Sequence, residues 1–292
     1  MGHSSPDQAA VVITGCSTGI GAACARELAR RGFRVFAGVR SESDFRRLAA
    51  EGSAGLVPLR LDVTKGDQIE AAARQVEQSL GSARLAGLVN NAGTVVAGPL
   101  ELLPIGELRR QWEVNVIGQV AVTQAFLPIL RRSGGRIVNM GSFNGRIAPP
   151  YMGPYAASKF ALEAISDCLR TELRHWNIHV ALIEPGSIAT PIWEKTLAAA
   201  DALRSAIRPE ALALYEADVE AMRAASRLMA QAALPVATVV RAVVHALTAR
   251  RPKCRYPIGL QTRLLFRAIK WVPDPLWDRI VQRWLRLPRH RP

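Results

Sequence analysis

Short apolar runs alternate with amphipathic helical stretches through the first two thirds of this 292-residue chain, and this alternation limits the possible folds more than any other feature. Each run is rich in Val, Ile or Leu and is bounded by Gly, Pro or Asn. The runs cover residues 10–15, 34–39, 56–63, 85–90, 135–141 and 179–185, with a shorter one at 254–258. Strands buried on both faces of a parallel sheet have this composition. The repeated strand–helix–strand units predict an α/β fold, a doubly wound parallel sheet of the Rossmann type.

One domain is predicted for residues 8–258, because no linker, low-complexity tract or repeat of fixed period divides the chain. After Pro185 the strand pattern stops, and residues 187–233 are rich in Ala and Leu, so we expect helices there. Ligands of open α/β sheets bind beyond the carboxyl ends of the strands. These helices would therefore cover a substrate crevice, with plain helical packing as the alternative. Residues 259–292 are predicted to form a basic amphipathic helical extension.

Positive charge is concentrated at the C-terminal end of the chain. Residues 241–292 hold 13 Lys and Arg against 2 Asp and Glu, which is most of the net charge of +14. Residues 259–287 have the pattern of two amphipathic helices. Their apolar stripes comprise Leu260, Leu264, Leu265, Ala268 and Ile269 in the first helix and Leu276, Trp277, Ile280, Val281 and Trp284 in the second. Basic helices with Trp on the apolar face suit a membrane interface. The alternative is that the stripes pack on the domain or on a second subunit. Nucleic acid is not expected as a partner, because no recognition fold accompanies the charge.

The N-terminal residues lack the basic start and apolar core of a signal peptide, and no apolar stretch of about 18 uninterrupted residues occurs. We therefore expect a cytoplasmic protein, with peripheral membrane contact through residues 259–287. The four cysteines include no C-x-x-C pair, which indicates thiols in a reducing compartment. The five histidines are dispersed, and no metal site is predicted.

A glycine-rich turn follows the first apolar run. Residues 14–21 read T-G-C-S-T-G-I-G, with three glycines in a G-x-x-x-G-x-G pattern. Glycines allow a tight turn and close approach of the backbone to a pyrophosphate, while the helix that follows offers unpaired N–H groups and a partial positive charge. The turn therefore predicts a dinucleotide site. Its candidate cofactor contacts are Gly15, Ser17, Thr18, Gly19, Ile20 and Gly21.

The end of the second apolar run indicates which dinucleotide is bound. Sites for NAD usually carry an acidic residue there, which holds the ribose 2′-hydroxyl. This chain has Val39 and Arg40, and the first carboxylate is Glu42. A guanidinium binds a 2′-phosphate through charge-assisted hydrogen bonds. Arg40 therefore favours NADP as the cofactor, with NAD as the alternative.

A serine, a tyrosine and a lysine are expected to meet at the carboxyl edge of the sheet. Ser142 follows the fifth run, and Tyr155 and Lys159 lie one turn apart in the next helix. A free phenol titrates at about pH 10, and a nearby ammonium favours the ionised form. Tyr155 would then exchange a proton with the oxygen of an alcohol or carbonyl while hydride moves to or from the nicotinamide, and Ser142 would hold that oxygen. Asn115 would hold a water that links Lys159 to solvent.

Seven motifs stand in a fixed order along the chain. They are T-G-C-S-T-G-I-G (14–21), L-D-V (61–63), N-N-A-G (90–93), Asn115, Ser142, Y-A-A-S-K (155–159) and P-G-S-I-A-T (185–190). In this combination the chain resembles the short-chain dehydrogenase/reductase family over about residues 10–195. The resemblance implies a catalytic tetrad of Asn115, Ser142, Tyr155 and Lys159, with Lys159 also holding the nicotinamide ribose. It implies further cofactor contacts at Asp62, Val63, Asn90, Ala92, Gly93, Tyr155, Lys159, Pro185, Gly186, Ile188 and Thr190.

Within the family, the sequence is most similar to hydroxysteroid and retinol dehydrogenases, on the stretches 135–142, 158–167 and 180–186. This similarity implies a bulky apolar alcohol or ketone as substrate and a homo-dimer or homo-tetramer. The candidate substrate contacts are Ser142, Phe143, Tyr151, Tyr155 and Trp193, whose aromatic members are equally compatible with core positions. Two alternatives stay open: a 3-oxoacyl-thioester reductase with the same tetrad, and a dinucleotide-sensing binding protein without catalysis.

Overall fold

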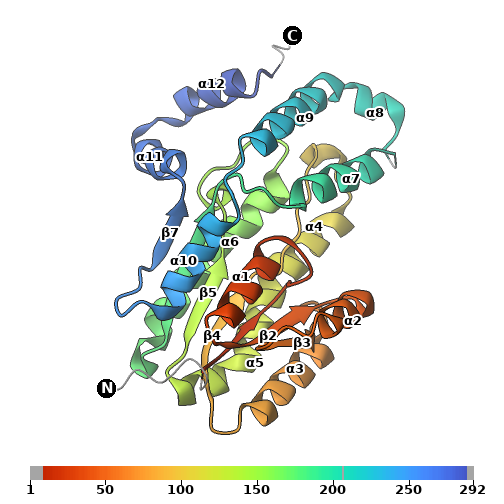
Figure 1. Cartoon of the computed structure of the whole chain (residues 1–292). Coiled ribbons are helices and arrows are strands. Elements are labelled where there is room, and N and C mark those ends of the chain that lie inside the picture. Colours follow the sequence, from red (N-terminus) through yellow and green to blue (C-terminus); the bar gives the residue numbers. More distant parts are fainter. Residues whose placement is uncertain (1–8, 206, 288–292) are drawn as a thin grey trace.

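Seven parallel strands form one sheet in the order β3-β2-β1-β4-β5-β6-β7 (Figure 1). They are β1 (Ala9–Ile13), β2 (Arg34–Val39), β3 (Leu56–Arg60), β4 (Arg84–Asn90), β5 (Arg136–Met140), β6 (His179–Pro185) and β7 (Arg255–Ile258). This computed structural model describes residues 9–205 and 207–287. The winding direction reverses between β1 and β4, where open α/β sheets bind their ligands. The predicted Rossmann-type fold is confirmed.

Helices cover both faces of the sheet, and alternate residues of each strand enter opposite cores. Val11 and Ile13 of β1 pack into one core, and Ala10 and Val12 pack into the other. The first core is closed by α1 (Gly19–Arg30), α2 (Glu42–Ala50) and α10 (Ala237–Thr248), and the second by α3 (Gly66–Leu80), α5 (Gly118–Ser133) and α6 (Gly153–Glu172). This two-sided burial explains why the strands have continuous apolar sequences.

One long helix crosses the second face of the sheet. It consists of α4 (Ile105–Trp112), a π-helical turn (Glu113–Ile117) and α5, and it runs without a break over Ile105–Ser133. Among the described helices it alone is long and apolar enough to cross a membrane, yet more than half of its most apolar stretch is buried inside the protein. Phe126 and Leu130 pack into the second core, as expected of the core helix of a globular domain.

The predicted helices between residues 187 and 233 are α7 (Ile192–Ser205), α8 (Pro209–Ala213) and α9 (Glu216–Gln231). Figure 1 shows them above the end of the sheet toward which the β7 arrow points, which is where the strands have their carboxyl ends. The sequence predicted helices and no strand pairing in this segment, and the structure differs in one detail. Ile188 forms an isolated parallel bridge with Leu234, so pairing continues briefly beyond β6.

The C-terminal extension forms two helices, the first next to the end of β7 and the second beyond it (Figure 1). They are α11 (Leu260–Ala268) and α12 (Asp274–Trp284), joined through a short 3-10 turn (Ile269–Trp271). The predicted apolar stripe of the first helix does not pack on the domain as a unit. Leu260 and Leu264 are exposed, and Thr262 and Phe266 are the buried side chains of α11. The domain limits at 8–258 and 259–292 stay predictions, and their outer ends, residues 8 and 288–292, lie outside the described residues.

A cluster of charges joins β6 to α6 and β7. Glu184 of β6 is fully buried, and its carboxylate lies 2.8 Å from Nε of Arg146. Arg255 of β7 forms ion pairs with Glu163 (3.1 Å) and Asp167 (2.7 Å) of α6. Burial, together with the neighbouring Glu163 carboxylate, raises the pKa of Glu184 to about 8. This cluster holds together three of the elements that border the carboxyl edge of the sheet.

Replacing Glu184 by Gln should change how stability depends on pH. The folded protein keeps the Glu184 proton up to about pH 8, whereas an unperturbed carboxyl of this type loses it around pH 4.5. The unfolded chain therefore releases the proton first, and the wild type loses stability as pH rises through this window. Glu184→Gln removes that loss. We expect its free energy of unfolding to rise relative to the wild type by on the order of a few kcal/mol across the window, as measured by urea unfolding on either side of it.

The matched control is Glu70→Gln, which alters an exposed ion pair with Arg74 and should show no such pH dependence. A difference between Glu184→Gln and the wild type that stays constant from acid to alkaline pH would contradict the raised pKa.

Candidate active site

The glycine turn connects β1 to α1 and depends on the absence of side chains. Gly15 and Gly19 have positive φ angles of 69° and 62°, which favour glycine. A Cβ on Gly15 would lie 2.8 Å from Cα of Ala92, and a Cβ on Gly21 would lie 2.3 Å from the carbonyl oxygen of Gly15. No other residue fits at these two positions without moving the backbone. The turn therefore packs directly against the end of β4.

Hydrogen bonds hold this contact in place. Asn91 Nδ2 donates to the carbonyl oxygens of Thr14 (2.9 Å) and Gly15 (3.0 Å). The Thr14 hydroxyl accepts from the backbone N–H groups of Asn91 (3.0 Å) and Ala92 (2.9 Å). Neither Thr14 nor Asn91 is among the residues predicted from the sequence, although both belong to quoted motifs. Their partners lie on another strand, which the sequence alone does not reveal.

The predicted contact Asn90 lies one layer deeper. It is buried, and its amide donates to Thr123 Oγ1 (2.9 Å) of α5 and to Asn139 Oδ1 (3.0 Å) of β5. Asn90 therefore ties α5 and β5 to the end of β4, below the surface on which a cofactor would lie. Gly93, three residues further, is exposed at the crevice and next to Asn115, whose Oδ1 would lie 3.4 Å from a Cβ at this position.

The N-terminus of α1 fits a pyrophosphate. Thr18 occupies the N-cap position, but its side chain makes no capping hydrogen bond, so the first N–H groups of the helix have no side-chain partner. Two cations flank the turn. Arg47 of α2 donates to the carbonyl oxygen of Ser17 (2.8 Å), and Lys195 of α7 donates to the hydroxyl of Thr18 (3.2 Å). Arg47 is also paired with Asp44 (2.9 Å) and Glu51 (3.1 Å), so an anion at this helix end would meet the N–H groups and mainly the positive charge of Lys195. The sequence did not identify Arg47 or Lys195, because the fold brings them from distant segments.

Arg40 follows β2 directly and is exposed at the carboxyl edge of the sheet. Its carbonyl oxygen accepts a hydrogen bond from Arg60 (2.7 Å), the last residue of β3. Glu42 is engaged by Arg46 (2.9 Å) and lies 3.8 Å from Arg60. The chain therefore presents two arginines at this corner, and the nearest carboxylate is already paired with basic side chains.

The predicted adenine contacts Asp62 and Val63 follow β3. The backbone N–H of Asp62 donates to Gln68 Oε1 (3.0 Å), and its carboxylate accepts from the N–H (3.0 Å) and the hydroxyl (2.8 Å) of Thr64. Val63 is buried in the second core. These bonds fix the loop at the edge of the crevice with a defined shape.

Ser142, Tyr155 and Lys159 come together at the carboxyl end of β5. Ser142 lies two residues beyond that strand, and Tyr155 and Lys159 lie in the first two turns of α6. The Ser142 hydroxyl is hydrogen-bonded to the Tyr155 phenol. Lys159 Nζ donates to the carbonyl oxygen of Met140 (2.7 Å) and lies 5.7 Å from the centroid of the Tyr155 ring. The three side chains form one polar group, with further buried polar side chains such as Asn115, Asn144 and Ser158 nearby.

Burial governs the ionisation of this group. It raises the pKa of Tyr155, and the hydrogen bond with Ser142 opposes this only in part. It lowers the pKa of Lys159 to about 8. The expectation that Lys159 makes Tyr155 more acidic is therefore wrong for the protein by itself. The ammonium is bonded to Met140 and stands several ångströms from the ring, so the desolvation of the phenolate outweighs its attraction.

Asn115 lies within the π-helical turn, a feature frequent at functional sites. It is fully buried. Its Nδ2 donates to the carbonyl oxygen of Thr94 (3.0 Å) and to Ser158 Oγ (3.1 Å), and its Oδ1 accepts from the N–H of Thr94 (2.8 Å). The amide was expected to hold a water. That water stays a prediction; the structure shows that the amide joins the loop after β4 to α6 beside Lys159.

The segment after β6 closes the other side of the crevice. Pro185 ends β6, and Gly186 can carry no side chain freely, because a Cβ would lie 2.9 Å from Thr262 Oγ1. Ile188 is buried, and its carbonyl oxygen accepts from Trp193 Nε1 (2.9 Å). Thr190 faces the glycine turn, since a Cβ on Gly19 would lie 3.5 Å from Thr190 Cβ.

Besides Tyr155, the three aromatic side chains predicted to contact substrate all have aromatic or backbone partners. Phe143 stacks on Phe266 of α11, with ring centroids 6.4 Å apart. Tyr151 meets the ring of Tyr215 edge to face at 6.4 Å, and burial raises its pKa to about 12. Trp193 is partly buried and holds the loop after β6. Tyr151 and Phe143 thus connect the catalytic segment to α9 and α11.

Comparison with known proteins identifies this arrangement. A model of the short chain dehydrogenase family matches residues 9–201. The chain belongs to this family. It is 38% identical over 280 residues to human retinol dehydrogenase 5, covering 93% of this chain and 87% of the relative. It is therefore an NAD(P)-dependent oxidoreductase that acts on alcohols or carbonyl compounds, as the motifs predict.

Two solved structures are similar over almost the whole chain. A short chain dehydrogenase from Burkholderia cenocepacia in complex with NADP has a TM-score of 0.71 and 25% identity, over 98% of this chain and 100% of that one. A short chain dehydrogenase/reductase from Burkholderia phymatum in complex with NAD has a TM-score of 0.77 and 26% identity, over 94% and 98%. The prediction of a nicotinamide dinucleotide, NADP with NAD as the alternative, agrees with both complexes.

Gly21→Ala should damage the glycine turn. The added Cβ would lie 2.3 Å from the Gly15 carbonyl oxygen, so the turn must move away from β4. We expect a loss of about 1–3 kcal/mol in stability and at least about tenfold weaker binding of NADPH, because the N–H groups of α1 would no longer converge. Thermal unfolding and a fluorescence titration with NADPH measure the two effects.

Gly66→Ala, at the start of α3, is the control, since nothing lies within 4 Å of its Cβ position. It should leave NADPH binding unchanged and stability equal or slightly higher. Equal NADPH affinity in both variants would show that the turn does not bind the cofactor.

Proposed function

We propose that the protein transfers hydride between NADP(H) and a hydrophobic alcohol or carbonyl compound of retinoid-like or steroid-like character. The observation that carries this proposal is the convergence of Ser142, Tyr155 and Lys159 beside a glycine turn with unpaired helix N–H groups. A hydroxyl, a phenol and an ammonium at the switch point of a Rossmann sheet are the groups that such a reaction needs.

Each group has a distinct task in the proposed mechanism. The nicotinamide, when bound, supplies or accepts the hydride. Tyr155 gives a proton to the substrate oxygen during carbonyl reduction and takes it back during alcohol oxidation. The Ser142 hydroxyl, which is already bonded to the phenol, holds and orients the same oxygen. Lys159 holds the nicotinamide ribose, and Asn115 keeps α6 in register with the loop after β4 through Ser158 and Thr94.

The pKa shifts favour an acid role for Tyr155 in the free protein. Burial keeps the phenol protonated at neutral pH, as carbonyl reduction requires. Lys159 is mainly charged below about pH 8 and loses that charge as pH rises. The affinity for a dinucleotide held by its ammonium should fall over the same range.

Tyr155→Phe removes the hydroxyl that exchanges the proton and leaves the ring in place. We expect kcat to fall by at least about a hundredfold, because proton transfer by a positioned side chain contributes about 10²–10⁴-fold. NADPH affinity should change by less than about threefold, since the binding contacts are elsewhere. Steady-state assays with a panel of retinoid, steroid and acyl-thioester substrates measure the first quantity, and fluorescence titration measures the second.

Tyr256→Phe provides the control, because this β7 tyrosine bonds His245 and the Lys253 N–H away from the crevice. Its turnover should stay near that of the wild type. If Tyr155→Phe retains comparable turnover, the assignment of Tyr155 is wrong. Turnover of acyl thioesters alone would favour the 3-oxoacyl-thioester reductase, and no turnover of any substrate by the wild type would favour a binding protein.

The preference for NADP(H) is proposed from the corner formed by β2 and β3. Arg40 is exposed where the adenosine ribose would lie, and Arg60 stands beside it. Glu42, the nearest carboxylate, is paired with Arg46 and is not set up to bind a ribose diol. A 2′-phosphate would meet positive charge at this corner, whereas a 2′-hydroxyl would find no acceptor of comparable strength.

Arg40→Ser should reverse much of this preference. Hydrogen bonds to charged groups contribute about 1.5–3 kcal/mol, so kcat/KM for NADPH should fall at least about tenfold while that for NADH changes little. Arg74→Gln, an exposed arginine of α3 that pairs with Glu70 away from this corner, should leave the ratio unchanged. An unaltered ratio in Arg40→Ser would remove Arg40 from the cofactor site.

We further propose that the enzyme is cytoplasmic and binds membranes peripherally through residues 259–287. Large apolar side chains on this segment face solvent: Leu260 is 70% exposed, Trp271 86% and Trp284 55%. Helices that are basic and carry exposed Trp and Leu bind at the interface of anionic lipids. This location would bring the enzyme to the surface where apolar substrates dissolve. Flotation of the wild-type chain with liposomes tests the association.

A further inference from the structure

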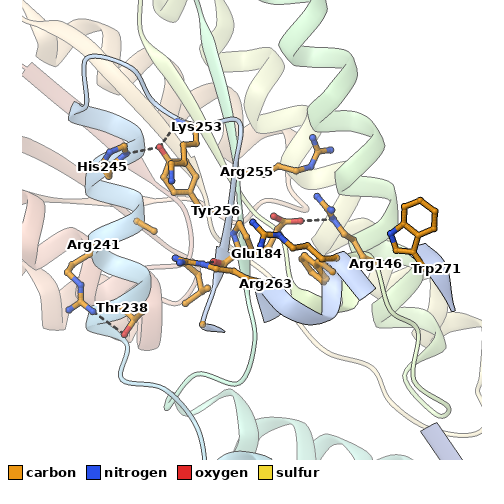
Figure 2. Close-up of a pocket in the computed structure, with 16 residues that line it drawn as sticks. Arg146, Glu184, Thr238, Arg241, His245, Lys253, Arg255, Tyr256, Arg263 and Trp271 are labelled. Carbon is orange, nitrogen blue, oxygen red and sulfur yellow. Dashed lines mark hydrogen bonds and ion pairs between the residues drawn. The ribbon is translucent and has the colours of Figure 1, made fainter. Parts of the chain in front are cut away.

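A surface groove of about 1080 Å³ runs along the outer edge of β7, apart from the candidate active site (Figure 2). Its walls come from α10, the strand itself and α11. Six of the lining residues are basic: Arg146, Arg241, Lys253, Arg255, Arg263 and Arg267. Among the described residues, Glu184 is the only acidic one that lines it. The groove is therefore strongly positive, with the aromatic rings of Tyr256, Phe266 and Trp271 in its lining.

The six cations fall into two groups. Arg146 lies beside Glu163 (3.7 Å) and Glu184 (2.8 Å), and Arg255 pairs with Glu163 and Asp167, so both belong to the charge cluster. The other four form no ion pair within the described residues: Arg241, Lys253, Arg263 and Arg267. Arg241 donates a hydrogen bond only to the Thr238 hydroxyl (3.4 Å), and Arg263 donates only to the carbonyl oxygen of Pro257 (3.2 Å). Four unneutralised cations around one cavity repel each other, and an anion bound between them would remove that repulsion.

The open edge of β7 offers no place for another strand. Pro257 lacks an N–H, and Arg263 occupies its carbonyl oxygen. The neighbouring residues of β7 that direct their backbone groups inward are paired with β6. A second copy of the chain would also bring an equally basic groove against this one. Both features argue against strand addition and against a second copy of this chain at this edge, and a smaller anionic ligand fits the groove better.

The surroundings of the groove indicate a ligand with an apolar part. Trp271 lines the groove and is almost fully exposed, and Leu264 of α11 is exposed on the same short segment. A molecule whose charged end lies among the four cations would have its apolar end beside these side chains. A phospholipid headgroup at a membrane surface has this arrangement of charge and hydrocarbon.

We propose that the groove between α10, β7 and α11 binds the phosphate headgroup of an anionic phospholipid, with Arg241, Lys253, Arg263 and Arg267 as its cationic contacts. This inference rests on the proposed membrane association and gives it a defined lipid site. Diffuse attraction between a basic surface and anionic lipid depends only on the number of charges. Binding at a defined site depends on which charges are removed. Two variants that lose the same charge at different places therefore distinguish the two cases.

The test compares two double variants of the full chain that lose the same charge. Arg241→Gln/Lys253→Gln removes two groove cations, both exposed and free of ion pairs among the described residues. Arg250→Gln/Arg251→Gln removes two exposed arginines from the neighbouring loop that do not line the groove. Thermal unfolding confirms that both fold. Calorimetry measures the binding of monomeric dioctanoyl phosphatidic acid and of inorganic phosphate, and flotation uses phosphatidylcholine vesicles with and without phosphatidic acid.

We expect the groove variant to bind the soluble lipid at least about tenfold more weakly than the wild type, and the loop variant to bind it within about threefold. Inorganic phosphate should bind the wild type more weakly than the lipid. Equal losses in the two variants, or no binding of the soluble lipid, would overturn the groove site. Inorganic phosphate binding as tightly as the lipid would show a site for free phosphate and contradict the lipid assignment.

The two arms separate the groove from the membrane proposal. Vesicle binding by the wild type that is retained in the groove variant, with no binding of the soluble lipid, would leave membrane association standing and remove the groove site. Binding of the soluble lipid without vesicle flotation would support the groove site and contradict membrane association. Oxidoreductase turnover should stay unchanged in both double variants, because none of the four residues borders the crevice.

Discussion

The close contact between the glycine turn and the end of β4 determines where everything else in the site lies. Two glycines remove the side chains that would separate the segments, and Thr14 and Asn91 join them with four hydrogen bonds. This contact sets the direction of α1 and hence the position of its unpaired N–H groups. Arg47 and Lys195 then approach the turn from α2 and α7. The backbone geometry of the turn therefore determines the shape of the cofactor side, and the basic side chains add positive charge to it.

The catalytic side follows a different principle, because polar groups are buried there and must be satisfied by neighbours. Lys159 is bonded to Met140, and Asn115 to Thr94 and Ser158, so α6, β5 and the loop after β4 are held in one register. The charge cluster around Glu184 adds β6 and β7 to the same assembly. A buried polar group that loses its partner destabilises the fold, so a shift of any of these elements would lower the stability of the protein. Rigid placement of Tyr155 is the result.

The sequence predicted the parts of this design that depend on local pattern. Apolar runs located every strand, although the runs at 10–15 and 56–63 continue past the strand ends into turns in which Thr14, Leu61 and Val63 are also buried. It did not predict what depends on distant partners: Arg47 and Lys195 at the turn, Asn91 rather than Asn90 at the glycines, or the buried face of α11. The pKa of Tyr155 was assigned the wrong direction, because spacing reveals a nearby lysine but not the desolvation that outweighs it.

The two sides of the molecule also differ in how their charged side chains are paired. Most arginines of the Rossmann domain are paired with acids one turn away or across an element. The four groove cations, which form no ion pair within the part of the chain that the structure describes, meet in one place beside β7. Clustered like charges destabilise a compact fold unless a counter-charge is present. The fold also blocks strand addition at this edge through Pro257 and places exposed Trp and Leu next to the cations. These features have no use in packing. They are consistent with a surface that meets anionic lipid while the opposite corner of the sheet holds the dinucleotide.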